Sequence, residues 1–224
     1  MTARIAAVLC AAGLLAIEPA GDAQVVTAYR IETPAPGNPA ARFSSAELAV
    51  LEKINRADRN HLARLPQIAV PTLWADDERA YSQMPPRYEA ASKTARLVVV
   101  HVPGQMFGAY GFGQLVRWGP ISSGAAVTAT PAGTYHLTWR AVSHAYELPG
   151  RPASHGCIRL LDRDARWLFE WGREWRLEAS GTKVVATGTP VLIIGAFQFG
   201  VAPPWHSEGW LTRTVTLPPS TTGH

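Results

Sequence analysis

The chain has 224 residues, 47% of them hydrophobic, with a formal net charge of +4 and a pI near 9.3. This mild basic balance is compatible with attraction to anionic surfaces such as cell-envelope polymers, but the sequence lacks the lysine or arginine runs typical of nucleic-acid-binding proteins. About 200 residues suit a single domain with extensions, and no internal repeat divides the chain.

The first 23 residues have the layout of a secretory signal peptide. Arg4 precedes the apolar run IAAVLCAAGLLAI, and the small residues Gly21 and Ala23 provide a cleavage site. The run is too short to cross a bilayer, although an N-terminal membrane anchor is the alternative. We expect cleavage after Ala23 and an exported protein of the periplasm or cell envelope. No later apolar stretch is long enough to span a membrane.

The next two segments are expected to precede the main domain. Residues 24–43 are rich in proline and alanine and predict a linker. A helical and irregular extension follows over residues 44–95, opening with Ser44 and Glu47 in a capping box. Its helix has apolar residues at roughly helical spacing, namely Leu48, Leu51, Ile54 and Leu62. The proline-broken remainder is expected to wrap the surface.

From Arg96 onward the pattern is that of strands. Apolar and β-branched runs separated by Pro-Gly and Gly-Phe-Gly predict consecutive antiparallel strands up to residue 124. A turn and strand are expected in TPAGTYHLTW, and two strands flank the Thr-Gly-Thr-Pro turn at 187–190. Between them, a short helix is expected near Asp162, and residues 200–224 predict an irregular tail. The fold class is therefore mostly β.

The sequence holds two cysteines, Cys10 and Cys157, and removal of the signal peptide would leave one. Cysteines of exported proteins are usually paired. A single one indicates an intermolecular disulfide, a reactive thiol or a buried inert side chain. Cys157 is therefore unusual before any motif is considered.

Residues around Cys157 are suited to nucleophilic chemistry. His144 and His155 lie nearby in the sequence, and an imidazole that accepts the thiol proton generates the thiolate. Gly156 would let the backbone approach a substrate closely, so that N–H groups of the loop could face an oxyanion. Arg159 could hold a carboxylate. A zinc site is not expected, because the chain lacks a second cysteine here and the usual ligand spacings.

The segment ASHGCIRL, residues 153–160, resembles the signature of the L,D-transpeptidase catalytic domain, the YkuD-type fold. TPAGTY, residues 130–135, and GTPVLI, residues 188–193, are similar to two further segments of that family. The resemblance implies a β-sandwich catalytic domain over residues 96–199. This agrees with the mostly β plan read from the residues, which has one N-terminal helix before the sheet and one short helix after the cysteine loop. It implies no metal or organic cofactor.

The resemblance also assigns roles to single residues. Cys157 would be the nucleophile and His144 the general base, oriented through the backbone carbonyl of Ala145. His155 and Gly156, with the Cys157 amide, would line the oxyanion site. The two residues expected to shape the loop and contact substrate are Ser154 and Arg159.

The implied reaction is a cell-wall transpeptidation on peptidoglycan stem peptides. The thiolate attacks the L-to-D peptide bond of a tetrapeptide stem, releases D-alanine and forms a thioester. A neighbouring stem amine then gives a 3→3 cross-link, the amine of an outer-membrane lipoprotein gives anchoring, and water gives a carboxypeptidase. The alternatives are a catalytically weak peptidoglycan-binding relative and an unrelated exported cysteine hydrolase or thiol oxidoreductase. We expect a monomer.

One departure from the family pattern concerns the stretch between Tyr135 and His144. Family members generally have a longer segment here, so either the sheet is trimmed or a substrate-covering segment is missing. His136 is a rival base, but its place in an alternating strand pattern favours a position on the sheet face.

Several other residues are expected to be structural. Ser122 and Ser123 predict a turn, and the acidic run Asp76–Glu78 predicts a solvated helix start. The spacing of Trp167, Trp171 and Trp175 favours helix packing. Trp205 and Trp210, in the proline-rich tail, are the tryptophans that could contact glycan.

Overall fold

The computed structural model describes residues 28–34, 41–137, 150–173, 176–207 and 209–221. The expected signal peptide, with Cys10, lies outside the described residues, as do His144 and Ala145. Within the described part, no helix has the length and apolar character that a membrane span needs.

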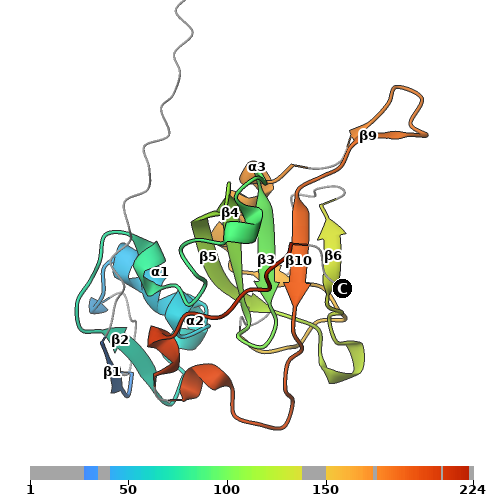
Figure 1. Ribbon diagram of the computed structural model, residues 1–224. Coiled ribbons are helices and arrows are strands. Elements are labelled where there is room, and N and C mark those ends of the chain that lie inside the picture. The colour runs from blue at the N-terminus through green and yellow to red at the C-terminus, as the bar shows by residue number, and fades with distance from the viewer. Residues whose placement is uncertain (1–27, 35–40, 138–149, 174–175, 208, 222–224) are drawn as a thin grey trace, which may run out of the picture.

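The centre of the molecule is a six-stranded curled sheet, so the expectation of a mostly β fold is confirmed (Figure 1). Its strands lie in the order β6-β10-β3-β4-β5-β7. As expected from the sequence, β3, β4 and β5 are consecutive and antiparallel. Strand β10 pairs parallel to β3, which the sequence did not indicate. The bounds are β3 (Leu97–His101), β4 (Met106–Gly111), β5 (Gln114–Ser122), β6 (Gly133–His136), β7 (Arg159–Leu160) and β10 (Pro190–Ile194).

Both faces of the sheet are covered, which explains the unbroken apolar run in β3. Successive side chains of a strand point to opposite faces. Leu97 and Val99 pack into one buried cluster, and Val98 and Val100 pack into another. A strand with both faces buried reads as a continuous hydrophobic run rather than an alternating one.

The first cluster is built largely by the N-terminal extension. Helix α1 (Ser45–Ile54) begins after Ser44, whose Oγ accepts from Glu47 N while Ser44 N donates to Glu47 Oε2. The expected capping box is therefore confirmed, although the helix stops at Ile54 and a separate α2 (Arg59–Leu62) follows. The four apolar residues expected on the helical face, Leu48, Leu51, Ile54 and Leu62, are all buried.

Two expectations about the segments that precede the main domain are wrong. Part of the expected linker is a strand, β1 (Tyr29–Glu32), which pairs antiparallel with β2 (Ile68–Pro71); four residues are too few to show a period. The proline-broken segment is not a surface wrap, since Tyr81 and Met84 are each 1% exposed. Two short 3-10 helices shape it, Glu78–Tyr81 and Glu89–Ala91.

The C-terminal tail has little regular structure, as expected, but it is fixed to the extension. Val215 N donates to Gln83 O at 2.8 Å, and Tyr88 Oη donates to Ser220 O at 2.9 Å. Its regular parts are two 3-10 helices, Pro204–His206 and Trp210–Thr212. Elsewhere in the chain, another 3-10 helix, Ala126–Thr128, follows β5.

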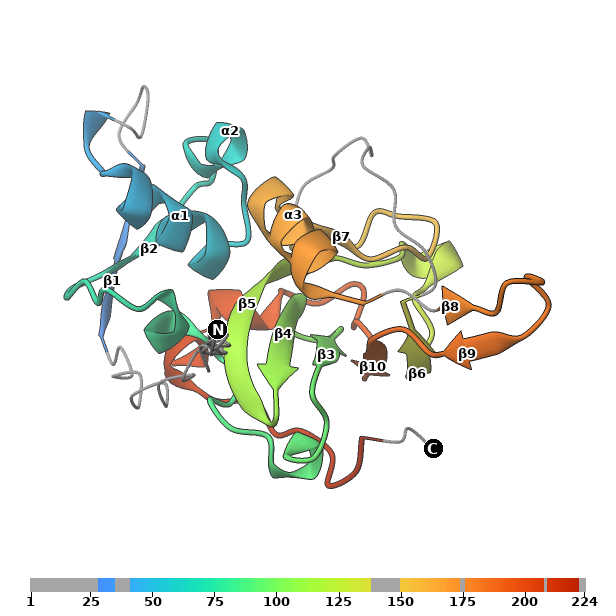
Figure 2. The same cartoon turned by 90° about the horizontal axis from the view of Figure 1, so that it is seen from above.

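The second cluster is covered by α3 (Asp162–Trp171), the helix expected after the cysteine loop (Figure 2). Trp167 and Trp171 stack on each other with ring centroids 5.0 Å apart and pack against this cluster, as their spacing predicted. Trp175 lies outside the described residues.

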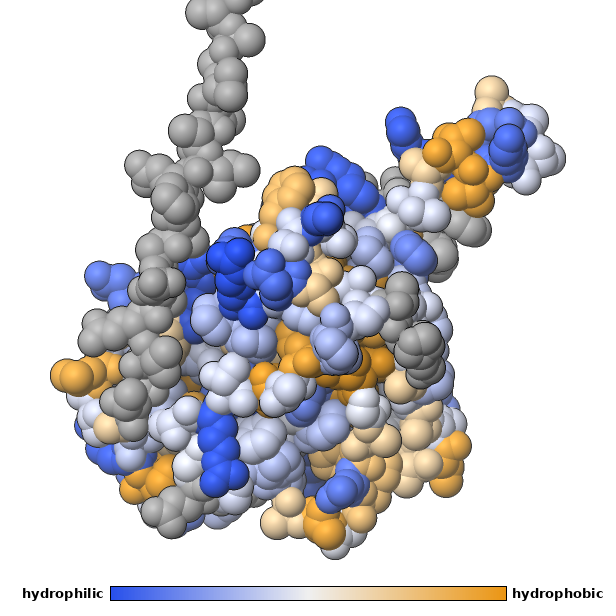
Figure 3. Space-filling model, viewed as in Figure 1, coloured by the Kyte–Doolittle hydropathy of each residue, from blue (hydrophilic) through white to orange (hydrophobic). Residues whose placement is uncertain are grey.

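A hairpin of β8 (Arg176–Leu177) and β9 (Val184–Ala186) projects from the body of the protein (Figures 1 and 2). The strands expected around the Thr-Gly-Thr-Pro turn are β9 and β10, but β9 pairs with β8 rather than with β10. Leu177 and Val185 are exposed, and Figure 3 shows apolar surface on this arm.

Candidate active site at one edge of the sheet

The topology brings the two signature segments to one edge of the sheet. Strands β3, β5 and β10 run in the same direction, because β3 and β5 are both antiparallel to β4 and β10 is parallel to β3. Their ends therefore meet at one edge, where β6 and β7 begin, since Gly133 lies opposite Ile193 and Arg159 opposite Ser122. The TPAGTY segment enters β6 and the cysteine loop enters β7 at this edge.

Ser154 closes the cysteine loop from inside. This residue is 1% exposed, and its Oγ donates to Cys157 O at 2.6 Å and accepts from Gly156 N at 3.1 Å. One hydroxyl thus fixes both ends of the Gly156–Cys157 turn. The side chain of Cys157, in contrast, is exposed.

The backbone of Ser154 is fixed as firmly as its side chain. Its carbonyl oxygen accepts from Ala125 N and from Thr128 Oγ1, both at 2.8 Å, and its N–H donates to Ser123 O at 3.1 Å. Ala153 N donates to the same Ser123 oxygen at 2.9 Å. Buried polar groups that are all hydrogen-bonded hold a loop in one conformation.

Thr130, the first residue of TPAGTY, links that segment to the cysteine loop. Its Oγ1 donates to Gly156 O and accepts from Gly124 N, at 2.9 Å each. The two segments singled out in the sequence therefore touch through hydrogen bonds, although 26 positions separate Thr130 from Gly156.

Two glycines make this packing possible. Gly156 has φ of +104°, a left-handed conformation that side-chain-bearing residues rarely adopt. At Gly124, which bridges to Ser154, a Cβ would collide with the Thr128 carbonyl oxygen.

The remaining expected site residues lie in and beside this loop. His155 is exposed, next to Cys157. Arg159 lies in β7, opposite Ser122 of β5, and is partly buried. His136, the rival base, is the last residue of β6 and is exposed on the sheet. Because His144 and Ala145 lie outside the described residues, their assignment stays a prediction.

Several residues that support the loop were not expected from the sequence. Ser122 and Ser123 do not form a turn: Ser122 ends β5, and the two are 0% and 1% exposed. Gln105, in the β3–β4 turn, is also fully buried and hydrogen-bonded to Ser123. The Ser-Ser-Gly composition is typical of a turn, and composition alone gives no sign of the buried residues that lie opposite these serines.

The acidic run behaves only in part as expected. Asp77 Oδ1 accepts from Arg79 N and caps a short helix, and its hydrogen bonds with Arg79 lower the pKa of the Asp77 carboxyl. Glu78, however, accepts from buried Lys53 Nζ at 2.7 Å rather than facing only solvent.

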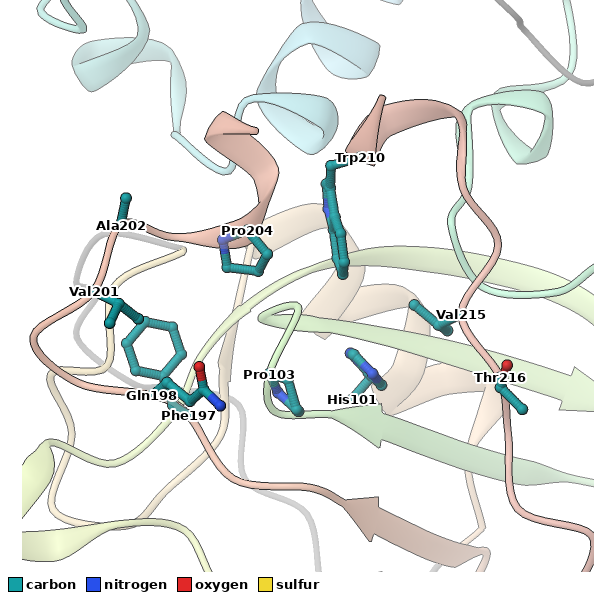
Figure 4. A pocket seen from close by; sticks show the side chains of 10 residues that line it. All are labelled: His101, Pro103, Phe197, Gln198, Val201, Ala202, Pro204, Trp210, Val215 and Thr216. Atoms are coloured by element: carbon teal, nitrogen blue, oxygen red, sulfur yellow. The ribbon is translucent and has the colours of Figure 1, made fainter. Parts of the chain in front are cut away.

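A pocket of about 390 Å³ lies at the same edge, between the β3–β4 turn and the C-terminal segment (Figure 4). His101 and Pro103 line it from the turn, and Phe197, Gln198 and Trp210 are among those lining it from the other side. Among the described residues that line it, none is a lysine, arginine, aspartate or glutamate.

The two tryptophans of the C-terminal tail lie in different environments. Trp205 is 9% exposed and packs against Phe197 and under the Arg56 guanidinium, so this residue belongs to the interior rather than to a glycan-facing surface. Trp210 lines the pocket, and its contact with glycan stays a prediction.

Residues 95–193 match the family model of the YkuD L,D-transpeptidase catalytic domain. This segment, which is less than half of the chain, is therefore similar to the L,D-transpeptidase catalytic domain. The match includes the TPAGTY segment, the cysteine loop and β10, which are the three parts of the sequence on which the resemblance depended. No curated protein matches the chain at a significant level.

Solved structures of L,D-transpeptidases are similar to the chain at low identity. That from Mycobacterium smegmatis is 18% identical with a TM-score of 0.34, over 45% of this chain and 59% of that one. That from Stackebrandtia nassauensis is 19% identical with a TM-score of 0.37, over 49% and 58%. For residues 123–326 of the protein from Xylanimonas cellulosilytica the values are 19% and 0.42, over 68% and 81%. The chain thus spans less than two thirds of the first two structures.

The chemistry available at the site is that of an exposed thiol on a rigid loop. Within the described ranges, no group of three or more His, Cys, Asp and Glu side chains is placed to hold a metal ion. The loop presents the exposed Cys157 thiol beside backbone N–H groups, and these are the kinds of group that acyl transfer uses.

Proposed function

We propose that the protein is an exported cell-wall L,D-transpeptidase with Cys157 as its nucleophile. The observation that carries this proposal is the contrast within the cysteine loop: the side chain of Cys157 is exposed, while Ser154 and Thr130 fix the backbone on either side of Gly156. A merely structural cysteine would be expected inside the fold, since free cysteine is among the most buried residue types.

In the proposed first half-reaction, His144 takes the proton from Cys157 Sγ. The thiolate attacks the carbonyl carbon of the L-to-D peptide bond of a tetrapeptide stem, and the carbonyl π electrons move to oxygen. Collapse of this intermediate breaks the C–N bond, and the departing D-alanine nitrogen takes the proton from the imidazolium. A thioester on Cys157 remains.

In the second half-reaction an amine attacks the thioester carbon and gives up a proton to His144, and the thiolate leaves. A stem amine yields a 3→3 cross-link, and the amine of an outer-membrane lipoprotein yields an anchored protein. Water in place of the amine yields an L,D-carboxypeptidase product. Ser154 and Arg159 are proposed to shape the cleft for the stem peptide, and Ala145 to orient the base through its carbonyl oxygen.

The oxyanion contact is assigned mainly to the N–H of Cys157. The Gly156 N–H already donates to Ser154 Oγ, so Gly156 contributes by its left-handed backbone, which turns the loop. His155 lies at the rim of the same turn. Removal of one oxyanion-hole donor typically costs 10²- to 10³-fold in rate. Because Ser154 is buried and its hydroxyl binds Gly156 N and Cys157 O, we assign it to fixing this turn rather than to the substrate contact that the sequence suggested.

Acylation by a carbapenem tests the proposal, because the β-lactam carbonyl imitates the donor amide. We expect intact-protein mass spectrometry to show one covalent adduct on the wild-type protein, mapped to Cys157, and no adduct on Cys157→Ala. A well-folded wild-type protein that forms no adduct would favour the alternative of a catalytically weak peptidoglycan-binding relative. Muropeptide analysis of sacculi incubated with the protein then identifies the acceptor.

The choice of base has its own test. We expect His144→Ala to reduce the rate of acylation at least 10²-fold, as loss of a general base does, and His136→Ala to leave the rate within about twofold of wild type. His136 is the matched control, since it is exposed in β6. The reverse result would assign the base to His136.

A further inference from the structure

Gln105 has an unusual position for a polar side chain. It lies in the turn between β3 and β4, is 0% exposed and has φ of +47°. A left-handed backbone is unfavourable for a residue with a side chain, and turns normally place glycine or asparagine there. The structure therefore keeps a glutamine where glycine would be easier, which indicates that its side chain is required.

The side chain of Gln105 makes three hydrogen bonds, two of them to Ser123. Its Oε1 accepts from Ser123 N at 3.0 Å, while its Nε2 donates to Ser123 Oγ at 2.8 Å and to Val102 O at 2.7 Å. The side-chain amide of Gln105 therefore binds both the backbone N–H and the hydroxyl of Ser123.

Ser123 transmits this restraint to the cysteine loop. Its carbonyl oxygen accepts from both Ala153 N and Ser154 N. Ser154 Oγ in turn contacts Cys157 O and Gly156 N. A continuous set of short hydrogen bonds thus runs from Gln105 through Ser123 and Ser154 to the nucleophile.

We propose that Gln105 is a positioning residue that fixes the cysteine loop from the β3–β4 turn, so that Cys157 Sγ and its own N–H meet the same carbonyl group. This inference rests on the proposed function. Gln105 acts without touching substrate. Its loss would let the loop shift, and a misplacement of about 1 Å can cost on the order of 10²-fold in rate.

Gln105→Gly is the variant of choice. Glycine adopts the left-handed backbone easily, so this variant removes the three side-chain bonds while relieving the backbone strain. Hydrogen exchange of the hydrogen-bonded amides in segment 153–157, those of Ala153, Ser154 and Gly156, should become at least tenfold faster than in wild type. Acylation of Cys157 by a carbapenem should slow 10- to 100-fold. Alkylation by iodoacetamide, which needs only an accessible thiol, should change less than threefold.

Gln83→Ala is the matched control. Gln83 is also a fully buried glutamine; its Nε2 donates to Tyr81 O and Leu211 O, and its Oε1 accepts from Arg56 Nη2. Arg56 also donates to Gly104 O, but none of these bonds involves the Gln105 side chain, Ser123 or the cysteine loop. This variant should lower the midpoint of thermal unfolding at least as much as Gln105→Gly, yet leave hydrogen exchange at 153–157 and the ratio of acylation to alkylation at wild-type values.

The outcomes separate the two proposals. If the hydrogen-exchange rates at 153–157 in Gln105→Gly equal those of the wild-type protein, the positioning role is overturned, whether or not the protein is acylated. Faster exchange there, with acylation slowed in Gln105→Gly alone, supports the positioning role. A wild-type protein that exchanges slowly at 153–157 but forms no adduct would contradict the proposed function, and exchange in the variant would still decide the role of Gln105. Equal slowing of acylation in Gln83→Ala would also overturn the inference, because it would reduce Gln105 to a contributor to stability.

Discussion

The environment of His101 makes the stability of the folded protein depend on pH. The imidazole lies at the end of β3, where its Nδ1 accepts from Gly104 N at 2.9 Å, so the neutral ring carries its proton on Nε2. Burial, together with the nearby Arg56 guanidinium, lowers the pKa of His101 from 6.5 to about 4. The folded protein therefore holds this ring neutral over a range in which the unfolded chain protonates it.

The free energy of unfolding should fall as the pH is lowered from about 6.5 to about 4, because over this range the unfolded state binds more protons than the folded state. The loss from His101 is at most about 3 kcal/mol, and the full contribution is present above pH 6.5. Urea unfolding of wild type and His101→Gln across this range measures it, and the variant should show the shallower pH dependence. Parallel curves would contradict a buried neutral His101.

At the scale of single residues, the sequence pointed to the loop but not to what holds it. The Ser-His-Gly-Cys order is local, so it could be found along the chain. Gln105 and Ser123 act through contacts across the sheet, and neither the turn signal Pro-Gly before Gln105 nor the Ser-Ser-Gly composition reveals that they face each other.

At the scale of elements, the contacts of α3 with the N-terminal extension matter for the candidate active site, because α3 follows directly after the cysteine loop and β7. Its buried Asp164 accepts from Arg117 Nε at 2.7 Å and lies 3.5 Å from Lys53 Nζ of α1. Lys53 is 0% exposed and also donates to Trp118 O. A charged cluster thus ties a helix of the extension to the helix beside the candidate active site.

Asp164→Asn should lower the free energy of unfolding by about 3 kcal/mol, because breaking a buried ionic cluster by removing one charge leaves its partners uncompensated. Asp162→Asn on the same helix is the control. Asp162 forms an exposed i,i+4 pair with Arg166, and such pairs contribute about 0.5 kcal/mol or less. Denaturant unfolding of both variants measures the difference, and equal effects would show that the buried cluster adds nothing specific.

The elements themselves were largely predictable where their signals are local. The capping box at Ser44 and the apolar runs of β3 to β5 were sufficient to locate a helix and a sheet. Strand β1 was missed because its four residues pair with β2 across a separation of almost forty positions, and a polar, exposed edge strand leaves no hydrophobic period.

For the whole molecule, the boundary near residue 95 divides the family match from the extension but does not divide the core. The first buried cluster unites Leu51, Tyr81 and Met84 of the extension with Val99 and Tyr110 of the sheet. Sequence patterns describe segments one at a time, so they could not show that residues 44–95 pack against one face of the six-stranded sheet.

A fragment of residues 96–224 should therefore fail to fold cooperatively. Without the extension, one face of the sheet would expose side chains that are now fully buried, including Tyr110 and Trp118. Burying a large side chain of this kind contributes about 1.5–3 kcal/mol, and several are lost together from a protein whose net stability is of the order of 5–15 kcal/mol. The chain beginning at residue 24 is the control and should unfold in one sharp thermal transition with native near-UV circular dichroism. If the 96–224 fragment gave the same transition and were acylated at Cys157, the sheet and its second cluster alone would be enough to build the site, and the extension would be an accessory to it.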